Sequence, residues 1–102
     1  MQKSIEKKLP KITELFVKHH ITRAYLFGSV LTDKFNRKSD VDFLVSISEA
    51  LEPVEQGDHL WGLRYDLMDL IGRKVDILTE RSLKNPYFIE EINETKQLIY
   101  GA

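Results

Sequence analysis

The sequence predicts a small fold of the α/β (α+β) class, in which helices pack on one face of a mixed three-stranded sheet. Two stretches repeat apolar residues at helical spacing, and three short apolar and aromatic runs have the length and composition of strands. The chain has 102 residues, 42% of them hydrophobic, which is enough for one core. We therefore expect residues 1–102 to form a single domain.

The first part of the chain predicts a helix followed by a strand. Apolar residues recur there every three or four positions between lysines and glutamates: Ile5, Leu9, Ile12 and Phe16. This spacing predicts an amphipathic helix over residues 4–19, in which Pro10 marks either a kink or a later start. The apolar run over residues 23–27 predicts the first strand, and Gly28 ends it.

The second strand is predicted over residues 41–47, after a short helical turn and a polar loop that together span residues 30–39. Successive side chains of a strand point to opposite faces of the sheet. Phe43 therefore faces one side with its apolar neighbours two positions away, whereas Asp42 and Leu44 face the other side.

The second half of the chain predicts a linker, a helix, a third strand and a short last helix. The linker covers residues 48–58 and contains a proline and a glycine. A stripe of leucines predicts a helix over residues 59–71, which Gly72 ends. Residues 74–78 form the third strand, and residues 87–93 form a short helix before a tail. This pattern leaves the order and direction of the strands open.

Charge and composition exclude several classes of protein. The net charge of −1 gives no basic surface, so a nucleic-acid adaptor is disfavoured and direct nucleic-acid binding is not expected. The chain has no cysteine, which excludes disulfides and thiolate metal sites. Because no apolar run has the length of a membrane span or a signal-peptide core, we expect a cytoplasmic protein without a membrane partner. An open sheet edge favours partner binding or a homo-oligomer of undefined stoichiometry.

Three aspartates interrupt the apolar strands: Asp40 and Asp42 at the second strand, and Asp76 within the third. Aspartate is disfavoured in strands, so its presence there needs a reason. If the two strands are neighbours, the three carboxylates converge, and such a cluster can hold one or two Mg²⁺ ions that also bind substrate phosphates. The third acid can instead take the proton of an attacking hydroxyl.

A Gly-Ser turn follows the first strand, at Gly28 and Ser29. It offers free backbone N–H groups, a small residue that permits close approach, and a hydroxyl, all of which suit a phosphate. For the Asp-x-Asp pair alone, solvent-exposed acids on an open sheet face would be the commoner explanation. The third acid and the Gly-Ser turn together favour a metal and phosphate site.

In combination these residues resemble a known family. Gly28-Ser29, followed after ten residues by Asp40-Val41-Asp42 and later by Asp76 in a Val-Asp-Ile triplet, is similar to the minimal nucleotidyltransferases (MNT) of the polymerase β superfamily. The resemblance extends over nearly the whole chain, from the leading helix to the closing segment NPYFIEEINETKQLIYG. The combined pattern is specific, although each part of it is common.

The resemblance implies an activity and a role for each matching residue. Gly28 and Ser29 would hold the β- and γ-phosphates of ATP or another nucleoside triphosphate, and Ser39 would either assist nucleotide binding or serve the turn. The catalytic and Mg²⁺-binding residues would be Asp40, Asp42 and Asp76. The last of these would complete the metal site or act as the base. The reaction would transfer a nucleotide, AMP from ATP, to a hydroxyl acceptor.

The resemblance also implies a partner. Many members of the family are antitoxins encoded beside a HEPN-domain toxin, which the transferase can nucleotidylate. The expected partner is therefore a HEPN-domain toxin protein, although no residue of this chain shows it directly. The rival hypothesis is a binding module, a transferase fold that neutralises its partner by contact with weak or no catalysis.

One part of the phosphate-binding segment departs from the family pattern. A small residue, an arginine and a glycine commonly occur where this chain has Leu31, Thr32 and Asp33. The exchange removes a cation and adds an acid, which weakens contacts with a triphosphate and favours the binding-only rival. Arg37 and Lys38 either restore the positive charge or are solvated loop residues.

The remaining histidines and aromatic residues are predicted to have structural roles. His19 and His20 end the first predicted helix, where cations suit the helix dipole, and His59 is assigned to the same class. Four aromatic residues are expected to be buried rather than to lie at an interface: Trp61, Tyr65, Tyr87 and Phe88.

Overall fold

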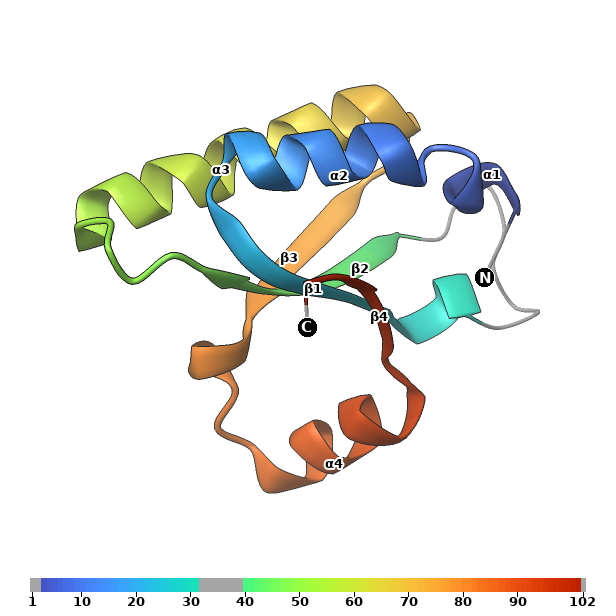
Figure 1. The fold of residues 1–102 in the computed structure, drawn as a ribbon. Coiled ribbons are helices and arrows are strands. Elements are labelled where there is room, and N and C mark those ends of the chain that lie inside the picture. The colour runs from blue at the N-terminus through green and yellow to red at the C-terminus, as the bar shows by residue number, and fades with distance from the viewer. Residues whose placement is uncertain (1–2, 32–39, 102) are drawn as a thin grey trace.

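The computed structural model describes residues 3–31 and 40–101, apart from the side chain of Ser29 (Figure 1). The elements are α1 (Lys3–Glu6), α2 (Leu9–Lys18), β1 (Ile21–Phe27), the 3₁₀ turn η1 (Gly28–Leu31), β2 (Val41–Ile47), α3 (Pro53–Ile71), β3 (Val75–Thr79), the 3₁₀ turn η2 (Glu80–Ser82), α4 (Pro86–Thr95) and β4 (Gln97–Tyr100). The predicted first helix is divided, since α2 begins next to Pro10. None of the described helices is long and apolar enough to cross a membrane.

The sheet is mixed, with its strands in the order β3-β2-β1-β4. β1 pairs antiparallel with both β2 and β4, whereas β2 and β3 are parallel. The predicted sheet had three strands, and the fourth, β4, forms from residues predicted as a tail. β4 has only four residues, and none of them is buried. So short a segment does not show the alternation of apolar and polar residues that identifies a strand in a sequence.

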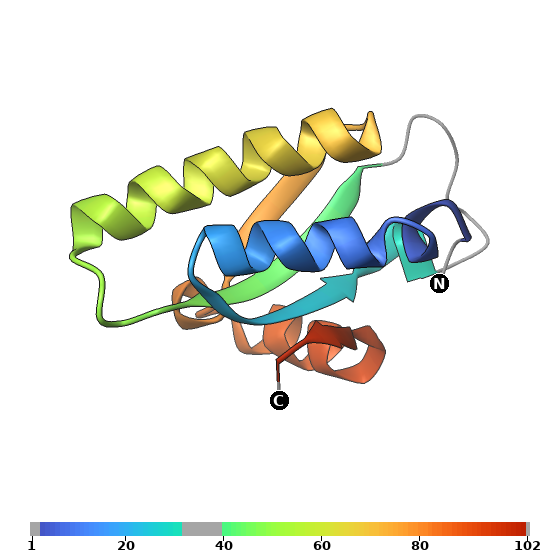
Figure 2. The same cartoon turned by 45° about the horizontal axis from the view of Figure 1, so that its top comes forward.

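Helices cover both faces of the sheet. α2 and α3 pack side by side on one face, where the main core includes Phe16, Phe43 and Leu63, and α4 lies on the opposite face (Figures 1 and 2). The α4 face has a smaller core of Phe27, Leu44 and Ile92. The prediction placed the helices on one face of the sheet. In the structure, β1 and β2 supply buried apolar side chains to both faces of the sheet, and helices cover both faces.

The helix α3 begins six residues earlier than predicted, at Pro53 rather than at residue 59. Pro53 occupies the first turn, where a missing N–H costs nothing, and the backbone N–H of Glu52 donates to Glu55 Oε1 at 3.2 Å. A proline that usually indicates a linker therefore starts the helix. At the other end Gly72 adopts φ +74 as the C-cap, as predicted.

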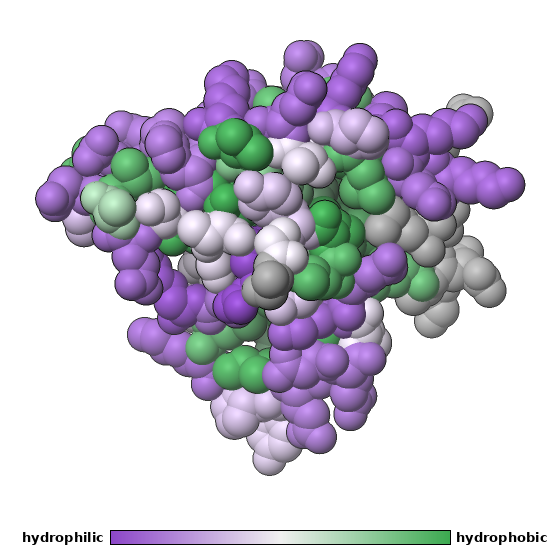
Figure 3. Space-filling view, viewed as in Figure 1, coloured by the Kyte–Doolittle hydropathy of each residue, from purple (hydrophilic) through white to green (hydrophobic). Residues whose placement is uncertain are grey.

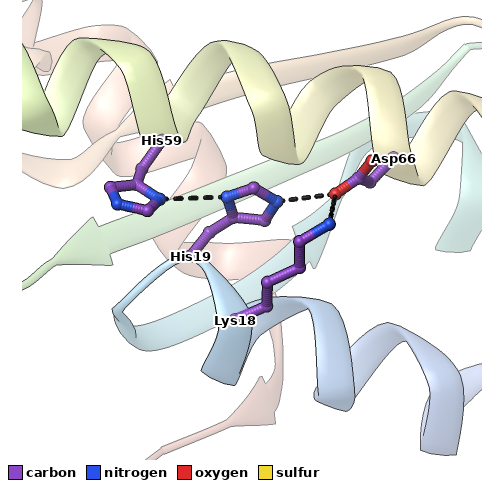
Figure 4. Close-up of polar contacts among 4 residues, drawn as sticks. All are labelled: Lys18, His19, His59 and Asp66. Carbon is purple, nitrogen blue, oxygen red and sulfur yellow. Dashed lines mark hydrogen bonds and ion pairs between the residues drawn. The ribbon is translucent and has the colours of Figure 1, made fainter.

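A histidine cluster joins α2 to α3 (Figure 4). The buried His19 ring lies with Nε2 2.7 Å from Asp66 Oδ2 and Nδ1 3.1 Å from His59 Nδ1, while Lys18 Nζ donates to the same Asp66 oxygen at 2.9 Å. The ring fits closely against Gly62, where an added Cβ would lie 2.9 Å from His19 Cε1. The predicted structural role is confirmed for His19 and His59.

The four aromatic residues predicted to be buried are exposed, so that prediction was wrong. Trp61 is 57% exposed, Tyr65 62%, Tyr87 83% and Phe88 39%. On α3 the stripe that enters the core consists of Leu63, Leu67 and Ile71, and Trp61 stacks on Tyr65 outside it. On the face seen in Figure 3, hydrophobic residues show between the upper helices and α4, among mostly hydrophilic ones.

Candidate active site

The parallel pairing of β2 and β3 brings two of the predicted acids together. Asp42 and Asp76 are register partners on these adjacent strands, and both point to the face that α4 covers. Phe27 is the register partner of Asp42 on the other side, at the end of β1. The convergence expected for neighbouring strands is therefore present for Asp42 and Asp76.

Gly28 follows Phe27 and passes directly beside Asp42. Its φ of +80 lies in the left-handed region, and a Cβ built on it would lie 2.6 Å from Asp42 Oδ2. Both the backbone conformation and the available space therefore require glycine here. The first turn of η1 begins at this residue, so its backbone and the Asp42 carboxylate form one surface.

The electrostatics of the site centre on Asp42. Partial burial, reinforced by the charges of Asp76 and then Asp40, raises the pKa of the Asp42 carboxyl to about 6. A carboxylate in this position is costly unless a proton or a cation neutralises it. Asp42 therefore lies within electrostatic reach of both other acids.

Two basic side chains lie beside the outer acids. Arg64 on α3 approaches Asp76, with Nη2 4.0 Å from Oδ1, and Lys74 approaches Asp40, with Nζ 3.9 Å from Oδ2. These ion pairs are long and partly exposed, so each contributes little to stability. They offset part of the negative charge at the edges of the site.

A cleft of about 420 Å³ lies over the two paired acids. Asp42, Asp76 and Arg64 give it a polar side, and Phe27, Leu78 and Phe88 give it apolar walls. A few polar groups in an otherwise apolar hollow of this size are typical of a small-molecule site. The arrangement suits a ligand that has both an aromatic or apolar part and a part that binds cations.

The donor set is consistent with Mg²⁺, which prefers carboxylate oxygens. Among residues 3–31 and 40–101, however, no three acids or histidines are close enough together to form a ready-made metal site. Asp40 precedes β2 and lies beside Lys74, and its charge contributes least to the raised pKa of Asp42.

Several predicted site residues lie outside the described part of the structure. They comprise the side chain of Ser29 and the residues Thr32, Asp33, Arg37, Lys38 and Ser39. Within the segment that is predicted to bind phosphates, the structure describes Gly28, the backbone of Ser29, and Leu31, all of which lie in η1. The predictions for the remaining residues stay predictions.

Sequence reasoning missed two residues that line the cleft, Arg64 and Phe88. Arg64 lies on α3, on the opposite face of the sheet from Asp42, and reaches its position at the edge strand β3 by donating from Nε to Val75 O at 3.0 Å. Phe88 follows the N-cap Asn85 of α4, whose Oδ1 accepts from the Phe88 backbone N–H at 3.3 Å. Only the packing of α3 and α4 identifies these residues.

Comparison with known proteins identifies the family to which this mixed sheet, with its paired aspartates beside a glycine turn, belongs. Residues 10–102 match the family described as "Polymerase beta, Nucleotidyltransferase". Two provisionally named protein adenylyltransferases of Methanocaldococcus jannaschii, MJ1217 and MJ0128, are each 35% identical over 98 residues, which cover 96% of this chain and 92% of theirs. The chain belongs to the polymerase β-type nucleotidyltransferase family.

Solved structures share the fold. A structure described as a provisional minimal nucleotidyltransferase superposes with a TM-score of 0.72 at 26% identity, covering 93% of this chain and 92% of that one. A toxin–antitoxin crystal structure with AMP-PNP gives a TM-score of 0.71 at 23% identity, covering 92% and 73%. The tri-AMPylated Shewanella oneidensis HEPN toxin in complex with MNT antitoxin gives 0.66 at 20% identity, covering 95% and 72%.

Proposed function

We propose that this protein transfers AMP from ATP to a hydroxyl group of a partner protein. The observation that supports the proposal most directly is the pairing of Asp42 with Asp76 beside the Gly28 turn, in a cleft large enough for part of a nucleotide. The family supplies the reaction class, and the names of the M. jannaschii relatives, protein adenylyltransferases, supply a protein as the acceptor.

The reaction exchanges one bond at phosphorus for another. The acceptor oxygen attacks the α-phosphorus of ATP, an O–P bond forms, and the bond from the α-phosphorus to the bridging oxygen breaks. Pyrophosphate leaves with the electron pair of that bond. The hydroxyl proton passes to a carboxylate, for which Asp76 is suited because its side chain is 44% exposed and lies on the edge strand β3.

The remaining roles follow from the chemistry of each residue. The backbone of Gly28 and Ser29 holds the β- and γ-phosphates, because the missing Cβ allows close approach, and Ser39 assists from the following loop. The metal ligands in this proposal are Asp40 and Asp42, and Asp76 either completes the metal site or acts as the base. The bound Mg²⁺ supplies positive charge that neutralises the carboxylates and the phosphates.

The partner in this proposal is a HEPN-domain toxin, and the protein is its antitoxin in the cytoplasm, where ATP is available. Support comes from the toxin–antitoxin structures that share the fold, one of which contains an AMP-PNP ligand and another an AMPylated HEPN toxin. A second candidate function, neutralisation by binding alone, is favoured by Leu31, Thr32 and Asp33, which depart from the family pattern.

One experiment distinguishes the two functions. The protein is mixed with α-labelled ATP, Mg²⁺ and the product of the neighbouring gene, which this proposal expects to be a HEPN-domain protein, and label on that product is measured. We expect transfer by the wild type and none by the Asp40→Asn/Asp42→Asn double variant. If the pair binds but no label moves, the enzymatic function is wrong. If the double variant still neutralises the toxin fully, binding alone is sufficient.

A further inference from the structure

A second hollow adjoins the cleft, and the proposed reaction does not yet use it. This groove, of about 230 Å³, lies between α3 and the edge strand β3 and is lined by Gly57, Leu60, Trp61, Arg64, Ile77 and Thr79. Arg64 and Ile77 line both the groove and the cleft. The groove and the cleft therefore meet at these two residues, next to Asp76.

The direction of the groove follows from its contacts. Arg64 marks the end near the acids, because its Nε donates to Val75 O at 3.0 Å and its Nη2 lies 4.0 Å from Asp76 Oδ1. Gly57 and Thr79 mark the far end, since α3 and β3 run in opposite directions there. From Val75 to Thr79 an extended strand spans about 13 Å, so four or so residues of an extended peptide match the groove.

The floor of the groove is the outer edge of β3, which pairs with no other strand among the residues that the structure describes. Lys74 O accepts from the backbone N–H of Val41 on β2, and alternate residues of a strand direct their backbone groups to opposite edges. The backbone groups of Val75 and Ile77 therefore point away from β2, as the bond from Arg64 to Val75 O confirms. Ile77 presents its N–H and C=O at this outer edge, in the arrangement that accepts an added strand.

The wall of the groove has an exposed aromatic residue held in place. Trp61 is 57% exposed, its ring stacks on Tyr65 at a centroid distance of 6.0 Å, and Arg64 Cζ lies 5.7 Å from the Trp61 ring centre. Exposed tryptophan and arginine side chains in fixed positions are enriched at the energetic centres of protein interfaces. A partner chain that covers Trp61 would be placed directly beside the reaction centre.

We propose that this groove seats the acceptor polypeptide. An extended segment pairs with the free edge of β3 at Ile77, places an apolar side chain against Leu60 and Trp61, and delivers its hydroxyl-bearing residue to the Asp76 end. The inference rests on the proposed transfer to a protein. It adds the class of acceptor that the site selects: an extended segment with an apolar residue a few positions from the modified hydroxyl.

Gly57 provides the sharpest test, because its Cβ would meet nothing within 4 Å and its side chain would enter the groove. The variants Gly57→Ala and Gly57→Leu improve helix propensity within α3, so neither should unfold the protein. Using the HEPN-domain protein as acceptor, we expect Gly57→Leu to raise the KM for the acceptor about tenfold or more. Gly57→Ala should have a smaller effect, and the KM for ATP should change less than twofold or so in both variants.

Controls separate this inference from the function on which it rests. Val17→Ala changes an exposed apolar residue on α2, away from the groove, and should leave both KM values unchanged. If the wild type transfers label and Gly57→Leu has the wild-type KM for the acceptor, the groove proposal is overturned and the proposed function stands. If the wild type transfers nothing, both are overturned.

A photo-crosslinker tests the position of the acceptor directly. With p-benzoylphenylalanine in place of Trp61, the crosslink should lie within about five residues of the modified hydroxyl, because an extended chain advances roughly 3.3 Å per residue along the groove. The same crosslinker in place of Val17 should give no crosslink to that segment. A crosslink from position 61 to a distant part of the HEPN protein would overturn the proposal.

Discussion

Asp42 and Asp76 lie opposite each other on the parallel strands β2 and β3, and this pairing creates the candidate site. The two acids come from strands separated in sequence by the whole of α3, so only the parallel register places their carboxylates on one face. Gly28 completes the arrangement from the end of β1. The candidate chemistry therefore depends on the same strand pairing that forms the centre of the sheet.

The pKa of Asp42 predicts that its charge destabilises the metal-free protein. The folded-state pKa of about 6 exceeds the ordinary aspartate value of 3.8, so the stability from the protonated form is present below the unfolded pKa and is lost as pH rises through about 6. Asp42→Asn should therefore raise the melting temperature in EDTA at about pH 7.5, and the gain should shrink toward about pH 4.5. A variant less stable than the wild type at the higher pH would contradict this account.

Gly28→Ala should destabilise the protein and impair transfer. A residue with a Cβ in the left-handed region costs about 1–2 kcal/mol, and the clash with Asp42 Oδ2 adds to that cost. Urea unfolding measures the change. Gly57→Ala is the matched control, because its Cβ has free space and the helix should gain up to about 1 kcal/mol. Equal stability of the two variants would show that the Gly28 turn is not under this constraint.

His19 should contribute far more to stability than the ion pair beside it. The His19 side chain is buried and bonded at both ring nitrogens, so His19→Ala should lower the free energy of unfolding by about 2–3 kcal/mol. Lys18 is exposed, and Lys18→Ala should cost about 0.5 kcal/mol or less. Chemical denaturation of both variants tests this ranking, and a larger loss for Lys18→Ala would refute it.

Acidification should weaken the same cluster. Hydrogen bonds from His19 and then Lys18 lower the pKa of Asp66, so its contribution is present above the unfolded pKa and is lost as pH falls through the folded pKa. Asp66→Asn should therefore have a lower free energy of unfolding than the wild type near neutral pH. The difference between the two proteins should shrink at acidic pH. If the difference in free energy of unfolding did not change with pH, Asp66 would stabilise the protein through packing rather than through its charge.

The sequence predicted the parts of the fold that depend on local pattern. The bounds of β2 agree with the prediction because Val41, Phe43 and Val45 alternate with residues of the other face over the whole strand. The start of α3 was missed because a proline in this position usually indicates a linker. Only the structure shows that the backbone N–H of Glu52 donates to Glu55 and so caps a helix that begins there. β4 was missed because it gains its hydrogen bonds from β1, which local pattern does not show.

The site was predictable in its acids and not in its surroundings. Asp42 and Asp76 were identified because aspartate is rare in apolar strands, and parallel pairing then placed them together. The contribution of Arg64 depends on how α3 packs against the edge of β3, and that of Phe88 depends on α4. The exposure of Trp61 could not be read from helical spacing, because spacing identifies a stripe without showing which stripe enters the core.

Nucleotide transfer to a protein by these acids is tested most directly by the intact mass of the HEPN-domain protein that we propose as the partner. After incubation with ATP, Mg²⁺ and the wild-type protein, we predict that the partner gains the mass of one or more adenylyl groups. After incubation with Asp76→Asn, or with the wild type in excess EDTA, its mass should not change. An unmodified partner with the wild type, or equal modification by Asp76→Asn, would contradict the account.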